Sequence, residues 1–118
     1  MGSQNIRRMW KHACTPVTVA AAGSAHGDAG EIPENAIVVF VTGADATKGV
    51  ALPKADPGQI IFLVNDASAT LKVYNCHHDA SVIGATAAET AYVMVADGTS
   101  IFVCASTSLW GVCPLISS

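Results

Sequence analysis

Charged and aromatic side chains are scarce in this sequence. Only 13% of its 118 residues are Asp, Glu, Lys or Arg, about half the usual share of a soluble domain, and 6% are aromatic. Hydrophobic residues make up 51% and are mainly Ala and Val, so small branched side chains must build the core. A mean hydropathy of +0.42 is high for a lone soluble monomer. This high hydropathy favours a protein whose exterior is partly packed against another subunit or a larger body. The alternative is a well-packed monomer with an uncharged polar surface.

The sequence also lacks long hydrophobic runs and a basic stripe. No stretch approaches the roughly 20 apolar residues of a membrane helix, and VTVAAAG is too short and too polar at its flanks for a secretory signal. Basic residues gather near the N-terminus, where Arg7, Arg8 and Lys11 precede a remainder with three lysines and nine acids. This segment either rests on an acidic partner surface or is a solvated end. Without basic residues in the β-rich part, nucleic-acid binding is not predicted.

Recognisable catalytic motifs are missing. The sequence has no GxSxG, no P-loop and no GxGxxG. Ser24, His26 and Asp28 sit in a Gly-rich stretch, whereas a catalytic triad needs a rigid scaffold. A catalytic pair of carboxylates, as in glycoside hydrolysis, would have to come from acids in predicted turns, where acids usually just form the turn. These acids are Asp56, Asp66, Asp79, Glu89 and Asp97. We therefore predict no catalytic residue, no cofactor and no enzyme.

The one cluster of potential metal ligands is Cys76-His77-His78-Asp79. Adjacent side chains on a strand point to opposite faces, so His77 and His78 would not share a metal there. We predict a surface turn and no metal site; adventitious metal binding and a pH-responsive interface are the alternatives. The four cysteines, Cys14, Cys76, Cys104 and Cys113, show no CxxC or zinc-ribbon spacing. Reduced thiols are favoured over disulfides because no export signal is evident.

What the sequence does contain is a series of short β-branched segments separated by turn residues. That spacing predicts an all-β fold, a small antiparallel sandwich or barrel of about 7–8 short strands. We expect an N-terminal arm over 1–14 and a single β domain over 15–118 with a long loop at 23–35. Ala36 to Thr42 is near-continuous in β-branched residues, as in a strand covered on both faces. Asp97-Gly98 predicts a hairpin between strands 91–95 and 99–105.

Trp110 lies in the last predicted strand, over 109–112. We expect it to pack in the core or at a subunit interface. The alternative is a sugar-stacking platform with Tyr74 or Tyr92, which would be thin because the chain has two Trp and two Tyr in all.

Four segments carry a resemblance to a known group. The first segment, Thr42 to Pro53, matches T-G-x-D-A-x-x-G-V-x-L-P, and the second, Gly58 to Asn65, resembles P-G-x-x-x-x-V-x-N. The third, Leu71 to Tyr74, reads L-K-V-Y, and the fourth, Phe102 to Trp110, is the closing segment of the series. In this order they resemble small β virion proteins of tailed bacteriophages, the capsid decoration (cement) proteins and heads of short fibres. The departure is Asn75, where the pattern has Pro.

The resemblance implies a structural protein on the outer surface of a phage capsid that stabilises it by bridging capsid subunits. Its partners would be the major capsid protein and further copies of itself, as a homotrimer, with assembly in the bacterial cytoplasm. Contact with the capsid or between subunits is assigned to Arg7, Arg8, Trp10 and Lys11. A fibre or tail-associated receptor- or glycan-binding module is the alternative function.

Overall fold

The computed structural model describes residues 15–87 and 89–115. These residues form short strands and one single-turn 3-10 helix, so the predicted all-β class is confirmed. The elements in chain order are β1 (Val17–Ala20), η1 (His26–Asp28), β2 (Gly30–Glu31), β3 (Val38–Thr42), β4 (Gly49–Ala51), β5 (Ile60–Asn65), β6 (Leu71–Tyr74), β7 (Val82–Ile83), β8 (Tyr92–Met94), β9 (Thr99–Ser106) and β10 (Leu109–Leu115).

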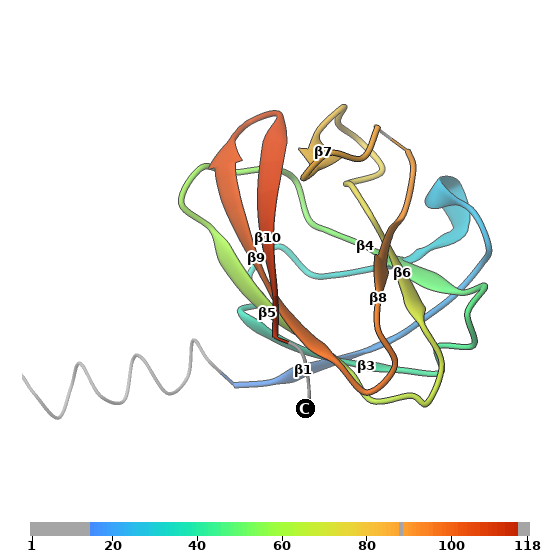
Figure 1. Ribbon diagram of the computed structural model, residues 1–118. Coiled ribbons are helices and arrows are strands. Elements are labelled where there is room, and N and C mark those ends of the chain that lie inside the picture. Colours follow the sequence, from blue (N-terminus) through green and yellow to red (C-terminus); the bar gives the residue numbers. More distant parts are fainter. Residues whose placement is uncertain (1–14, 88, 116–118) are drawn as a thin grey trace, which may run out of the picture.

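The strands form two mixed sheets (Figure 1). Sheet A has the order β1-β3-β5-β9-β10-β7, and sheet B has the order β2-β4-β6-β8. From β1 to β6 the chain alternates between the sheets, and each strand lies parallel to the strand two places earlier. This half is therefore a solenoid of three coils. The antiparallel pairs β5–β9, β6–β8 and β9–β10 and the parallel pair β7–β10 complete the sheets.

The predicted antiparallel sandwich or barrel is therefore wrong in its arrangement. Turn spacing shows where strands end, but it does not show which strand each will pair with. Here consecutive strands leave for opposite sheets, so parallel pairing arises without helical crossovers. The stretch 23–35, expected as one loop, contains η1 and β2, and β2 pairs with β4.

The Asp97-Gly98 turn was expected to form a hairpin, and that prediction is wrong. β8 belongs to sheet B and β9 to sheet A, so the turn joins the two layers. The buried Asn65 side chain holds it there by donating from Nδ2 to the Val95 carbonyl at 3.0 Å. The backbone amide of Asp97 donates to the Ala67 carbonyl at 2.9 Å. These tertiary contacts outweigh the local preference of Asp-Gly for a two-residue hairpin.

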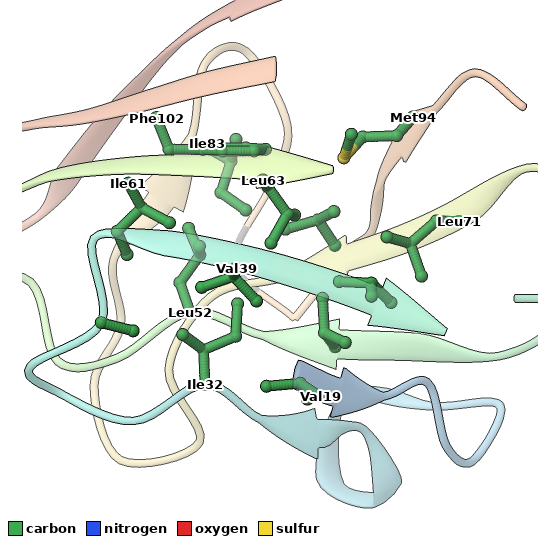
Figure 2. Packing of buried hydrophobic residues seen from close by; sticks show 14 of the residues in the cluster. Val19, Ile32, Val39, Leu52, Ile61, Leu63, Leu71, Ile83, Met94 and Phe102 are labelled. Atoms are coloured by element: carbon green, nitrogen blue, oxygen red, sulfur yellow. The ribbon is translucent and has the colours of Figure 1, made fainter. Parts of the chain in front are cut away.

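The main core lies between the two sheets (Figure 2). It is built from one side of each strand, as the alternation of buried and exposed residues in β3 and β5 shows. Val39, Ile61, Leu63 and Phe102 are fully buried there, and Trp110 has no exposed surface. Small branched side chains supply most of the remaining volume, as the composition predicts.

Sheet B has a second, smaller apolar layer on its outer side. Tyr74 alternates with the core residue Val73 and packs there with Ala29 and Ala51. The segment between β1 and β2, which contains η1, supplies part of this cover: the His26 and Tyr74 ring centroids are 5.9 Å apart, edge to face. The part of sheet B around Tyr74 is thus packed on both faces by residues of its own chain, whereas Val93 of β8 is 54% exposed.

Candidate functional site

Several residues singled out from the sequence fall outside the described part of the chain. Arg7, Arg8, Trp10 and Lys11, assigned to capsid or intersubunit contact, lie before residue 15, as does Cys14. The structure describes three other places where function could reside. These are a histidine cluster, a groove between two loops, and the outer face of sheet A.

The histidine cluster joins two segments that lie far apart in the sequence. His26 comes from η1, whereas His77 and His78 follow β6. The His26 and His77 ring centroids are 5.3 Å apart, and those of His77 and His78 are 6.2 Å apart, both edge to face. The sequence pattern did not reveal that His26 joins His77 and His78, because His26 is about 50 positions away.

Hydrogen bonds fix which nitrogen of each buried imidazole carries a proton. His26 Nε2 lies 3.2 Å from the Asn75 carbonyl and 3.1 Å from the Cys76 carbonyl, so this nitrogen donates. His77 Nδ1 lies 2.8 Å from the Glu31 carboxylate and donates to it. The Glu89 carboxylate faces His26 Nδ1 at 3.7 Å. The cluster ties the β1–β2 segment and the edge strand β2 to the loop after β6.

His77 Nε2 remains buried without a partner among the described residues. A carboxylate on Nδ1 is the usual support of a metal-binding imidazole. Within residues 15–87 and 89–115, however, no group of three or more His, Cys, Asp or Glu side chains is arranged to hold a metal ion. The geometry therefore supports a structural role for these histidines.

The other polar candidates are also engaged with backbone. The His26 ring is turned toward the Asn75 and Cys76 carbonyls, so it does not serve as a base for Ser24. Asp79 accepts hydrogen bonds from the Ser81 amide and hydroxyl at 3.0 and 2.6 Å, and from the Ala55 amide at 3.0 Å. Burial acts to raise the pKa of the Asp79 carboxyl, but these hydrogen bonds outweigh it and leave that pKa below its ordinary value.

Asn75 stands where the phage pattern has Pro, and its side chain organises the loop after β6. Its Nδ2 donates to the Cys76 carbonyl at 3.2 Å and to the Asp79 carbonyl at 3.1 Å. Its Oδ1 accepts from the Glu89 amide at 2.9 Å. Because the residue is 2% exposed, these bonds satisfy a buried amide that would otherwise be costly.

Among the described residues, Cys76, Cys104 and Cys113 are free thiols. Burial raises the pKa of the Cys104 thiol, so it stays protonated and unreactive. Tyr74 and Trp110 are each buried, in separate clusters, and Tyr92 packs edge to face on Phe102 with centroids 5.9 Å apart. These side chains do not present a flat aromatic platform to a sugar.

The outer face of sheet A is apolar and partly exposed: three of its seven side chains are exposed and four are half-buried. Its side chains alternate with core residues on β3, β5 and β9 and are Val38, Phe40, Ile60, Phe62, Val64, Ile101 and Val103. The registers place Val38, Phe62 and Ile101 side by side in one row. Ile60, Phe62 and Val103 are 38–42% exposed. No strand of sheet A contains Asp, Glu, Lys or Arg.

A groove runs between the β2–β3 loop (residues 32–37) and the β4–β5 loop (residues 52–59), and we name it the loop groove. Three adjoining cavities of about 350, 470 and 620 Å³ form it. Glu34 lines all three. His77 and His78 lie at one end, and Ile60 and Phe62 of the outer face of sheet A lie at the other.

Sequence reasoning did not single out Glu31, Glu34 or the outer-face residues. The signal for the outer face was present in the near-continuous β-branched runs, which indicate strands buried on both sides. The groove and the Glu31–His77 contact depend on the parallel pairing of the coils and have no local sequence signal.

A comparison with known proteins finds no matching family, no matching curated relative and no matching solved structure. No helix within the described residues is long and apolar enough to cross a membrane. The interpretation of function therefore depends on the surfaces described above.

Proposed function

We propose that this protein is a structural protein of a phage particle, which binds the outside of the capsid and bridges its subunits. The observation that carries the proposal is the partly exposed apolar face of sheet A. A soluble monomer gains nothing from seven aligned apolar side chains without a single charge among them. Such a face is typical of a surface that another protein covers.

The strand sequences support the same conclusion independently. Strands in parallel sheets read as near-continuous apolar runs when both of their faces are buried. β3 and β5 have such sequences and pair in parallel, yet each has one face buried and the other only half-buried, in β3, or half-buried to exposed, in β5. For the side chains of this face that lie away from the loop groove, such as Phe40 and Ile101, the missing cover is therefore expected from a second molecule.

The size of the outer face favours assembly on a particle over a free dimer. The three strands of this face, about 4.8 Å apart and about five residues long, present roughly 240 Å² in projection. A standard interface buries about 800 Å² on each partner. The face alone is thus expected to bind weakly in solution, and many copies on one shell add their contacts through a raised effective concentration.

The segments that resemble phage virion proteins occupy architectural positions, which fits a structural role. Asp45 Oδ1 accepts from the Thr47 hydroxyl at 2.6 Å and from the Lys48 amide at 3.1 Å, closing the turn before β4. Asn65 and Trp110 are buried supports of the turns and the core. The partners proposed are the major capsid protein and further copies of this chain as a trimer.

The decisive experiment replaces one side chain of the outer face. Val103→Lys should lower binding to capsids that lack the protein by about tenfold or more, because the lysine charge must lose its water in the contact. Val93→Lys is the matched control, since Val93 is 54% exposed on β8 of sheet B, away from this face. Equal binding by the two variants in a sedimentation assay would remove the support for this face.

Copy number per particle separates the two candidate locations. Quantitative mass spectrometry of purified particles should find hundreds of copies if the protein decorates the shell. A handful of copies would instead place it on a fibre or at the tail.

A further inference from the structure

The loop groove carries an inference that does not depend on the capsid role. Hydrogen bonds within the protein hold its walls in place without a ligand. The Gln59 side chain donates from Nε2 to the Glu34 carbonyl at 3.0 Å. The Phe62 amide donates to the Ile37 carbonyl at 2.7 Å, and the Ile32 amide donates to the Ala51 carbonyl at 3.0 Å. The groove is therefore a preformed surface.

Among the Asp, Glu, Lys and Arg side chains that line the loop groove, acids predominate. Glu31, Glu34 and Asp56 contribute three carboxylates, against the one ammonium of Lys54. Glu31 is partnered by His77. No cation of residues 15–87 or 89–115 forms an ion pair with the carboxylates of Glu34 or Asp56. A basic occupant would supply the missing counter-charge.

One end of the loop groove is apolar. The largest of the three cavities, about 620 Å³, is lined there by Ile37, Ile60 and Phe62. Ile60 is 42% and Phe62 is 38% exposed, so both side chains are accessible to an occupant. The occupant that fits combines basic side chains with a large apolar one.

The first 14 residues of the chain have this composition. They contain Arg7, Arg8 and Lys11 without any acid, and Trp10 stands among them. Trp and Arg are the residue types that most often anchor a protein contact.

The strand register brings this segment to the correct end of the molecule. β1 lies parallel to β3 with Val17 opposite Val39, and β3 lies parallel to β5 with Val38 opposite Phe62. The chain therefore enters β1 at the same end of the sheet A strands as Ile37 and Ile60. Two strand spacings separate these points, about 10 Å. The seven residues from Trp10 to Val17 span up to about 23 Å, which is enough to cross that distance.

We propose that residues 1–14 bind in the loop groove of their own chain. Trp10 covers the apolar end formed by Ile37, Ile60 and Phe62. Arg7 and Arg8, further from β1, lie along the acidic part toward Glu34 and Asp56. The order of side chains along the segment matches the order of surfaces along the groove.

Tryptophan fluorescence of the full-length protein tests this placement. The chain has two tryptophans, and Trp110 is fully buried in the core. Acrylamide, a neutral quencher, should reach neither of them in the native protein. In the Glu34→Lys/Asp56→Lys variant the segment is repelled, so about half of the emission should become quenchable. If Trp10 is already as quenchable in the native protein as in this variant, the proposal is wrong.

A charge swap gives the sharpest control. Arg7→Glu/Arg8→Glu should also expose Trp10, and combining these changes with Glu34→Lys/Asp56→Lys should restore its protection, because opposite charges again face one another. Asp66→Lys is the matched control for added positive charge. Asp66 is exposed beyond the other end of β5, so this change should leave quenching unaltered.

Dilution distinguishes the chain's own segment from that of another copy. Binding within one chain predicts the same quenching over a hundredfold range of protein concentration. Protection that disappears on dilution would mean that a second copy supplies the segment and would overturn the proposal. Phe40→Lys, on the outer face of sheet A opposite Val64 and away from the groove, should lower capsid binding while showing native quenching, so the two proposals fail separately.

Discussion

The outer faces of the two sheets differ in how they are covered. On sheet B, Tyr74 and Ala51 lie beneath the segment between β1 and β2, with His26 packed edge to face on the Tyr74 ring. On sheet A, side chains as apolar as these remain exposed. Under the proposed function, the apolar residues of a strand reflect its total burial, by its own chain in sheet B and by a second molecule in sheet A. Three experiments examine that difference.

The largest effect is expected when the covered face loses its main side chain. Tyr74→Ala should lower the free energy of unfolding by about 3 kcal/mol, because it leaves a cavity under the β1–β2 segment. Phe40→Ala, an aromatic truncation on the outer face of sheet A, should cost about 1 kcal/mol or less in the isolated protein, since less surface is buried there. Urea unfolding monitored by circular dichroism measures both, and equal losses would contradict the contrast between the faces.

A smaller effect is expected from filling the space that the Tyr74 ring uses. A Cβ atom on Gly49 would lie 2.9 Å from Tyr74 Cε2 and 2.7 Å from the Lys72 carbonyl oxygen. Gly49→Ala should therefore cost about 2 kcal/mol through displacement of the ring or of β6. Gly27→Ala is the matched control because a Cβ there meets no atom within 4 Å. A thermal unfolding temperature unchanged in both variants would show that the ring moves without cost.

The smallest effect concerns the loop after β6, which completes the cover of sheet B. Asp79 has a lowered pKa in the folded protein, so its contribution is present above its ordinary value of about 3.8 and is lost as pH falls through the folded pKa. Asp79→Asn should cost about 1 kcal/mol at pH 7, allowing for solvent screening, and much less at pH 2. Urea midpoints across pH 2–7 measure this. A difference between native and variant protein that stays constant with pH would show that the charge is not responsible.

Much of the fold was accessible from the sequence, but its pairing was not. The strands over 36–42 and 60–64 were predicted because their β-branched runs are bounded by strong turns. The alternation of strands between two sheets has no local signal, since it depends on which distant coil each strand meets. The absence of a recognisable repeat concealed the solenoid, because the coils share geometry while differing in sequence.

The candidate site likewise has one part that the sequence predicted and another that depended on strand pairing. Acids were predicted to form turns, and Asp79 accepts hydrogen bonds from the Ser81 and Ala55 amides. The partnership of His77 with His26 and Glu31 required knowledge that β2 lies beside β4 and that β4 lies beside β6. The roles proposed for Arg7, Arg8, Trp10 and Lys11 remain predictions from the sequence.

The coiled half of the molecule has a consequence for how such a chain can change its length. β1, β3 and β5 begin at Val17, Val38 and Ile60, so each coil takes about 21 residues. Because a coil contacts only its neighbours, a duplicated coil would add one strand to each sheet and lengthen the apolar wall by one strand spacing, about 4.8 Å. Evolution could thus widen the adhesive surface in fixed increments without redesigning the closing β9–β10 pair.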